Sequence, residues 1–182
     1  MEMIGFIGLG TIGSVVAEHL RKAGYPMVVH DIRPEALDPL VKVGAQLATS
    51  PAETARHCRV VFSSLPGPAE VEKVALGSNG LLHGVHDGSI YIYLSSSSPE
   101  LICRVESEFQ RVGACVMDAP LIVGKLGIAN KNVQILASGS VDTYHEVKPL
   151  LDALGDTVVY TGALGSGTVL NWPTIWCAEA LA

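Results

Sequence analysis

The chain has 182 residues, of which 48% are hydrophobic and 16% are charged, and its net charge is −6. This acidic balance, without a basic cluster, argues against binding to nucleic acid, and no apolar run reaches the roughly 18 residues that a membrane span requires. The cysteines lie far apart without C-x-x-C spacing, so we expect reduced thiols in one cytoplasmic domain and no metal site: Cys58, Cys103, Cys115 and Cys177.

A glycine motif follows the first apolar run. Residues 3–7 predict a buried strand, and a helical pattern runs from residue 11 to Gly24. Between a strand and a helix, G-x-G-x-x-G is typical of a dinucleotide pyrophosphate site. The first glycine permits the tight turn, the second lets the backbone approach the phosphates, and the third lets the helix pack closely, while the helix N-terminus attracts the anion. We therefore predict cofactor contacts at Gly8, Leu9, Gly10, Thr11, Ile12 and Gly13.

The next strand indicates which dinucleotide is preferred. The apolar run 27–30 ends in Asp31, about 20 residues after the motif, where a carboxylate can accept hydrogen bonds from the adenosine ribose. A carboxylate there repels a 2′-phosphate, so we predict NAD as the cofactor. Arg33 lies two residues further on and is a natural phosphate partner, which keeps NADP as the second choice.

Strand and helix patterns alternate through most of the remaining chain. Pro34 opens a helix to about residue 43, and Ser50 with Glu53 predicts a capping box at the next helix start. Further helices are expected at 67–76, 98–113 and 141–154, and strands at 45–47, 59–63, 89–93, 114–118, 133–137 and 157–161. This alternation predicts an α/β fold of the Rossmann type, with a doubly wound, mostly parallel sheet and helices on both faces.

The last stretch, residues 162–182, departs from the alternation. It begins with Gly165-Ser166-Gly167 and continues as a helical pattern that Trp172-Pro173 interrupts. Apolar residues crowd this segment: Val169, Leu170, Trp172, Ile175, Trp176, Ala178 and Leu181. An apolar surface of this kind is typical of an association site, so we expect a homo-oligomer formed through the C-terminal segment.

Three segments together resemble the β-hydroxyacid dehydrogenases, the family of 3-hydroxyisobutyrate dehydrogenase and tartronate semialdehyde reductase. They are Gly5–Gly13, Met117-Asp118-Ala119-Pro120, and Gly162–Gly167. The resemblance implies a cofactor domain, then a long interdomain helix and an all-helical second domain. We accordingly expect a dinucleotide-binding domain at residues 1–162, the start of the interdomain helix at 163–182, and no second domain.

The resemblance also implies site residues beyond the glycine motif. Leu65-Pro66 matches the loop that covers the dinucleotide, and Ser95-Ser96 matches a pair near the nicotinamide and substrate, with Ser96 as the expected contact. The implied reaction is hydride transfer between the nicotinamide and a small 3-hydroxy acid or its carbonyl partner.

The chemical site departs from the family pattern. Where the family has Ser-Gly-Gly to bind the substrate carboxylate, this chain has Ile122, Val123 and Gly124, which removes a hydroxyl donor and stiffens the turn. The family's catalytic lysine position falls on Asn171, whose amide cannot transfer a proton near neutral pH. Two other matched positions hold Tyr93 instead of aspartate and Ile175 instead of asparagine, and Lys125 is expected to be a solvated surface residue.

Three interpretations of function therefore stay open. The first is a nicotinamide-dependent oxidoreductase domain that is poorly active as given. The second is a cofactor-binding pseudoenzyme that senses nucleotide or acts as a scaffold. The third is a related reductase of another substrate such as an imine, for which an apolar wall at Ile122 and Val123 would be suitable.

Overall fold

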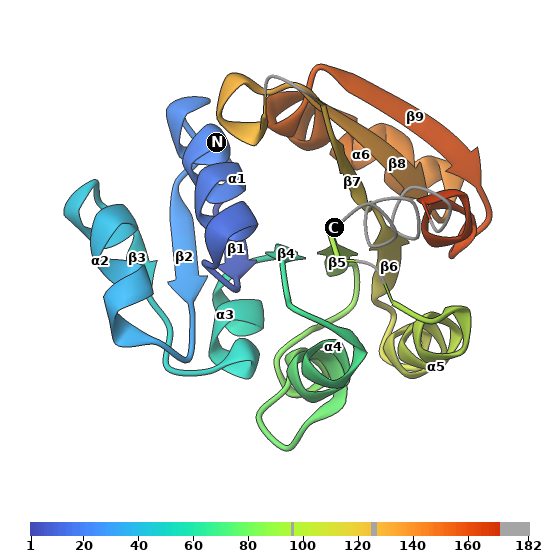
Figure 1. The fold of residues 1–182 in the computed structure, drawn as a ribbon. Helices are drawn as coiled ribbons and strands as arrows, with labels where there is room; N and C mark the ends of the chain where they lie inside the picture. Colours follow the sequence, from blue (N-terminus) through green and yellow to red (C-terminus); the bar gives the residue numbers. More distant parts are fainter. Residues whose placement is uncertain (96, 125–126, 172–182) are drawn as a thin grey trace.

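A central sheet carries helices on both of its faces (Figure 1). The computed structural model describes residues 1–95, 97–124 and 127–171. The first part of the sheet is parallel, in the order β3-β2-β1-β4-β5-β6. These strands are β1 (Ile4–Ile7), β2 (Met27–His30), β3 (Gln46–Leu47), β4 (Val60–Ser63), β5 (Ile90–Tyr93) and β6 (Cys115–Asp118). The expected Rossmann-type fold is confirmed.

The second part of the sheet contains the antiparallel pairings. Strand β8 (Val133–Ser138) runs antiparallel to β6 and to β7 (Leu121–Val123), and β9 (Thr157–Gly162) runs parallel to β8. Sequence patterns did not predict β7, because the family resemblance presented its residues as a turn. Its apolar residues instead extend along β8, with Ile122 opposite Gln134.

The helices divide between the two faces according to the alternation of the strands. On one face α1 (Thr11–Lys22), α2 (Pro34–Lys42) and α6 (Val141–Leu154) share a core with Ile4 and Phe6. On the other, α3 (Pro51–His57), α4 (Pro68–Leu76) and α5 (Pro99–Gln110) share a core with Ile7. Successive residues of a strand point to opposite faces, so four residues of β1 are sufficient to serve both cores.

Most predicted bounds agree with the structure to within a few residues, but one capping detail was wrong. Ser50 accepts a hydrogen bond from the Glu53 backbone N–H at 3.2 Å, as a capping box requires. The Glu53 carboxylate, however, accepts from the backbone N–H of Thr49 at 2.6 Å and from the Thr49 hydroxyl. The reciprocal bond is thus displaced by one residue, to the position before the cap.

In the part of the chain that the structure describes, two short 3-10 helices lie in the connections. One is η1 (Leu81–His83), between α4 and β5. The other is η2 (Ile128–Asn130), which joins β7 to β8 and packs against α1. The hairpin β7–β8 therefore reaches across to the helix that follows the glycine motif.

The register brings several sequence-predicted residues to one edge of the sheet. Ile7 is aligned with His30 and Ser63, and Tyr93 is aligned with both Ser63 and Asp118. Because these strands are parallel, their carboxyl ends meet, and the residues that follow each strand gather there. In open α/β sheets this edge is where ligands bind.

Candidate functional site

The glycine turn between β1 and α1 requires glycine at its first and third glycine positions. Gly8 has φ +87°, and a Cβ added there would lie 2.2 Å from the carbonyl oxygen of Ser64. A Cβ on Gly13 would lie 2.0 Å from the carbonyl oxygen of Gly8. Gly10 is different, because a Cβ there would meet only the Arg33 side chain, 3.9 Å away. The outer glycines are needed for packing, while the middle one borders open space.

The N-terminus of α1 faces the same space. Gly10 is its cap residue, no side chain caps the helix, and its first turn holds no acidic residue. The first helical hydrogen bond runs from the Ser14 N–H to the Gly10 carbonyl at 3.0 Å. Backbone N–H groups at the start of a helix, with the positive end of its dipole, form an anion-binding arrangement.

Asp31 follows β2 and ties the neighbouring loops together. Its Oδ2 accepts the Leu9 backbone N–H at 2.6 Å, and its Oδ1 accepts the Arg33 backbone N–H at 2.8 Å. Only 5% of its side chain is exposed. Burial tends to raise the pKa of Asp31, but the hydrogen bonds from Arg33 and Leu9 and the Arg33 charge outweigh burial and lower it. The carboxylate therefore stays ionised beside the glycine turn.

Ile32 and Arg33, which directly follow Asp31, both have exposed side chains. The sequence analysis predicted a role for Arg33 but not for Ile32. The Arg33 side chain is 52% exposed and contacts Asp31 through its guanidinium. Ile32 is 86% exposed, which is unusual for an isoleucine directly beside a predicted nucleotide site. An exposed apolar residue immediately after the candidate ribose acceptor was the signal that could have identified it.

The loop after β4 meets the loop after β5 at the same edge. Leu65 donates its backbone N–H to the Ser95 hydroxyl at 2.6 Å, and its side chain borders Gly8. Pro66 follows and is exposed. The structure thus places Leu65 and Pro66 next to the glycine turn, whereas Ser96 lies outside the described residues.

A buried polar network lies at the end of β6, and only part of it was anticipated. The Asp118 side chain is fully buried and accepts hydrogen bonds from the Thr168 N–H at 2.8 Å, the Thr168 hydroxyl at 3.0 Å and the Ser138 hydroxyl at 3.1 Å. The Tyr93 hydroxyl lies 3.2 Å from that of Thr168. Burial raises the pKa of Asp118, although these hydrogen bonds oppose the rise.

This network fixes the segment in which Asn171 lies. Residues 166–171 are helical, and a Cβ on Gly167 would lie 2.3 Å from the Leu136 carbonyl oxygen, so the segment packs directly on the sheet. Asn171 is buried, with 4% of its surface exposed. The predictions for Lys125, Trp172-Pro173 and Ile175 fall outside the described residues.

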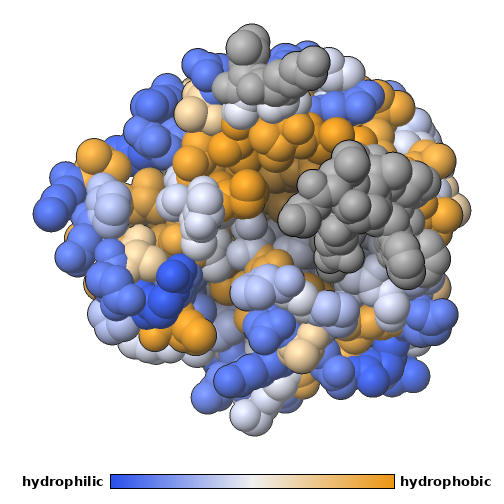
Figure 2. Space-filling view, in the orientation of Figure 1, coloured by the Kyte–Doolittle hydropathy of each residue, from blue (hydrophilic) through white to orange (hydrophobic). Residues whose placement is uncertain are grey.

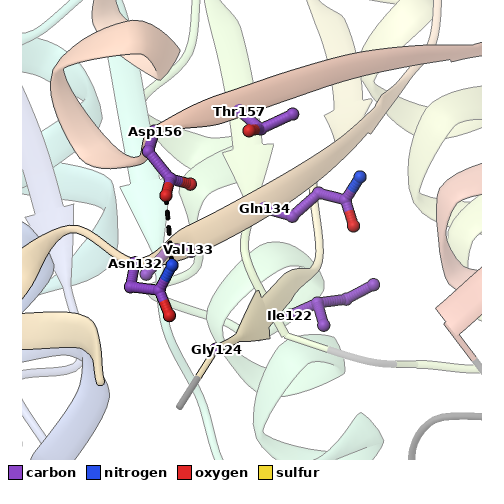
Figure 3. Close-up of a pocket in the computed structure, with 7 residues that line it drawn as sticks. All are labelled: Ile122, Gly124, Asn132, Val133, Gln134, Asp156 and Thr157. Carbon is purple, nitrogen blue, oxygen red and sulfur yellow. Dashed lines mark hydrogen bonds between the residues drawn. The ribbon is translucent and has the colours of Figure 1, made fainter. Parts of the chain in front are cut away.

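Two of the candidate substrate residues, Ile122 and Val123, lie on strand β7 instead of a turn. Because side chains alternate along β7, Ile122 and Val123 point to opposite faces and cannot form one apolar wall, which corrects that expectation. Ile122 and Gly124 border an open hollow of about 310 Å³ (Figure 3). Its other lining residues are Asn132, Val133, Gln134, Asp156 and Thr157.

The lining of this hollow is polar and acidic. The Asn132 amide donates to the Asp156 carboxylate at 3.2 Å, and Gln134 and Thr157 are neighbours across β8 and β9 (Figure 3). None of the described lining residues is cationic, and none belongs to the glycine turn. The hollow therefore lacks the positive charge that would attract a carboxylate.

An apolar, hollowed region lies between α1 and β7 (Figure 2). Both elements carry exposed apolar residues, with Ile12 37% and Val123 43% exposed.

Within the described residues, no group of three or more histidine, cysteine, aspartate or glutamate side chains could hold a metal ion. Among the helices described, none has both the length and the apolarity needed to cross a membrane.

The family described as the NAD binding domain of 6-phosphogluconate dehydrogenase matches residues 3–162. The chain belongs to this family. The mouse mitochondrial 3-hydroxyisobutyrate dehydrogenase is 35% identical over 164 residues, which are 90% of this chain and 49% of that protein. The NAD-dependent L-serine dehydrogenase of Pseudomonas aeruginosa is 32% identical over 93% of this chain and 57% of its own length. The predicted resemblance is thus confirmed, and the chain spans about half the length of these curated relatives.

Solved structures of related proteins have the same fold as this chain. A 3-hydroxyisobutyrate dehydrogenase of Mycobacterium tuberculosis with L-serine is 25% identical, with a TM-score of 0.84, covering 99% of this chain and 64% of that one. Psf3 in complex with NADP+ and 2-OPP is 28% identical, with a TM-score of 0.88, covering 94% of this chain and 61% of that one. An imine reductase from Pseudomonas sp., 24% identical with a TM-score of 0.86 over 99% of this chain and 63% of its own, shares the fold. The chain therefore contains the NAD-binding domain of this family, and it is similar in sequence to 3-hydroxyisobutyrate dehydrogenases.

Proposed function

We propose that this chain supplies the cofactor half of an oxidoreductase that transfers a hydride between NAD and a small 3-hydroxy acid or its carbonyl partner. The observation that carries the proposal is the open space at Gly10, bordered by the uncapped N-terminus of α1. Glycine at this position lets the backbone approach a pyrophosphate, and the helix N-terminus favours its charge.

The other cofactor contacts follow from their position at the same edge. Gly8, Leu9, Gly10, Thr11, Ile12 and Gly13 form the phosphate turn in this proposal. Asp31 serves the adenosine ribose, with Ile32 as an apolar surface beside it. Leu65 and Pro66 cover the dinucleotide, and Ser96, which lies outside the described residues, is kept as the expected contact near the nicotinamide and substrate.

When bound, the nicotinamide supplies the hydride chemistry, and the protein must manage the alcohol proton. Asn171 can hydrogen-bond a substrate oxygen but cannot exchange a proton near neutral pH, and Ile122 offers no donor to a carboxylate. The residues of this chain are therefore better suited to binding and orienting the cofactor and substrate than to transferring the alcohol proton.

The 182-residue chain is expected to turn over 3-hydroxyisobutyrate and glycerate far below the ordinary enzyme range of about 1–10³ per second. A positioned acid or base contributes about 10²–10⁴-fold to such a reaction, and position 171 provides neither. Steady-state assays with NAD measure the rate. Asn171→Lys alone should not restore it, because Ile122 is still present. Wild-type turnover within the ordinary range would contradict this expectation.

NADH is expected to bind more tightly than NADPH. The Asp31 carboxylate stays ionised at neutral pH because its pKa is lowered, and it repels a 2′-phosphate. Fluorescence titration with each reduced cofactor measures the ratio, and Asp31→Asn should narrow it. Tighter binding of NADPH by the wild type would show the preference to be wrong.

A reductase of a substrate without a carboxylate is the second candidate. It is favoured by the hollow beside Ile122, whose described lining includes Asp156 and no cation. A screen of hydroxy acids and cyclic imines with both cofactors separates the candidates. Turnover of hydroxy acids alone supports the first, turnover of imines supports the second, and binding without turnover indicates a pseudoenzyme that senses nucleotide or acts as a scaffold.

We further propose that the chain forms a homo-oligomer through its C-terminal segment. Val169 and Leu170 are 49% and 56% exposed, an unusual density of apolar surface on one helical turn. Sedimentation velocity should show association by the wild type and dissociation by the Val169→Ser, Leu170→Ser double variant. A matched control is Val43→Ser with Leu47→Ser, which are 52% and 56% exposed elsewhere. A monomeric wild type would contradict the proposal.

The proposed location is the cytoplasm, on the basis of composition alone. The mouse and human relatives carry the description mitochondrial in their names. Fractionation of cells that express the native gene decides between the two compartments.

A further inference from the structure

Arg33 is held at the glycine turn by Asp31. Its Nε lies 3.3 Å from Asp31 Oδ1 and its Nη2 lies 3.5 Å from Oδ2, while its backbone N–H donates to Oδ1 at 2.8 Å. Asp31 in turn accepts the Leu9 N–H within the turn. The carboxylate thus orients the guanidinium toward the loop that follows β1.

The guanidinium borders the space in front of Gly10. A Cβ built on Gly10 has one neighbour within 4 Å, the Arg33 Nη2 at 3.9 Å. The corresponding positions at Gly8 and Gly13 are filled by backbone atoms at 2.2 Å and 2.0 Å. Of the three glycines in the turn, the one that leaves room for a ligand is therefore the one that Arg33 approaches.

We propose that Arg33 binds the pyrophosphate of the dinucleotide and is not a reader of the 2′-phosphate. This inference rests on the dinucleotide site proposed above. Asp31 takes two of the five N–H donors of the guanidinium, and the fork geometry suits the other three to phosphate oxygens. A charge-assisted pair of this kind adds to the attraction of the helix N-terminus.

The charge balance of the site supports the same assignment. Asp31 places a negative charge next to the turn, which by itself would oppose an anionic ligand. Arg33 compensates this charge and keeps 52% of its side chain exposed. The pair thus allows one carboxylate to serve the ribose without repelling the pyrophosphate.

Binding of NADH, NADPH and adenosine to Arg33 variants tests the proposal. Adenosine carries neither the pyrophosphate nor the 2′-phosphate, and its affinity is measured by competition with NADH. Arg33→Ala should weaken NADH and NADPH by similar factors of about tenfold and leave adenosine unchanged. Arg33→Lys should recover part of the loss, because it keeps the charge without the fork. The weakening of NADH binding at high salt should also be smaller in Arg33→Ala than in the wild type.

Arg104→Ala is the matched control for net charge. Arg104 is 53% exposed and pairs with Glu72 on the other face of the sheet. Arg104→Ala should therefore leave the affinities for NADH, NADPH and adenosine unchanged. Selective loss of NADPH in Arg33→Ala would assign Arg33 to the 2′-phosphate and overturn the proposal. An equal loss of adenosine would show a structural role and also overturn it. Failure of the wild type to bind any dinucleotide would instead contradict the proposed function, and this inference with it.

Discussion

Alanine in place of Gly8 is expected to lower the free energy of unfolding by about 3 kcal/mol and the melting temperature by about 6–12 °C. The φ of +87° is unfavourable for alanine, and its methyl group would lie 2.2 Å from the Ser64 carbonyl oxygen. The turn can accept the methyl group only if β1 and the loop after β4 move apart. Differential scanning calorimetry of the variant without ligand measures the effect.

Gly10→Ala is the control for this prediction. Gly10 has φ −69° and ψ −166°, an extended conformation that alanine adopts, and its Cβ would meet only Arg33 at 3.9 Å. Its free energy of unfolding should stay within about 1 kcal/mol of the wild type. Equal destabilisation by the two substitutions would contradict the distinction between packing and ligand-facing glycines.

Asp118→Ala is expected to destabilise the protein by about 3–5 kcal/mol, because it leaves buried donors without an acceptor. The donors are the N–H and hydroxyl of Thr168 and the hydroxyl of Ser138. Asp118→Asn should lose much less, since its amide oxygen still accepts two of these bonds. Chemical denaturation of both variants measures the difference, and a loss below 1 kcal/mol in Asp118→Ala would contradict the role of the network.

The difference in stability between the wild type and Asp118→Asn should depend on pH with a defined sign. The pKa of Asp118 is raised in the folded state, so the folded protein binds the proton more tightly than the unfolded chain. The wild type should therefore lose stability relative to Asp118→Asn as the pH rises above the unfolded value of about 4. The difference should level off above the folded pKa. A difference that grows in favour of the wild type with rising pH would contradict the raised pKa.

Much of the cofactor side of the site could be predicted because it depends on local patterns. The glycine spacing, the apolar runs and the turn residues determine where each parallel strand ends, and parallel ends meet at one edge. Gly8 and Asp31 could thus be brought together from local patterns, whereas Leu65 was implied by the family resemblance. The agreement of β2 with the predicted range 27–30 reflects the same clear pattern.

The substrate side could not be predicted in the same way. The hydrogen bond between Asp118 and Thr168 joins residues 50 positions apart, and no local pattern indicates it. Strand β7 forms because Ile122 and its neighbours pair with β8. The family motif presented these β7 residues as a turn. The orientation of Arg33 depends on a side-chain contact with Asp31 that spacing alone leaves open.

Calorimetric titration of NADH into the wild type and Gly10→Ala tests the central claim most directly. The two proteins should melt at similar temperatures, since the added methyl group meets no backbone. The wild type should bind NADH at one site, and the variant should bind at least about tenfold more weakly, because the methyl group occupies the space that the pyrophosphate needs. Equal affinities in two equally stable proteins, or no binding by the wild type, would contradict a dinucleotide site at this turn.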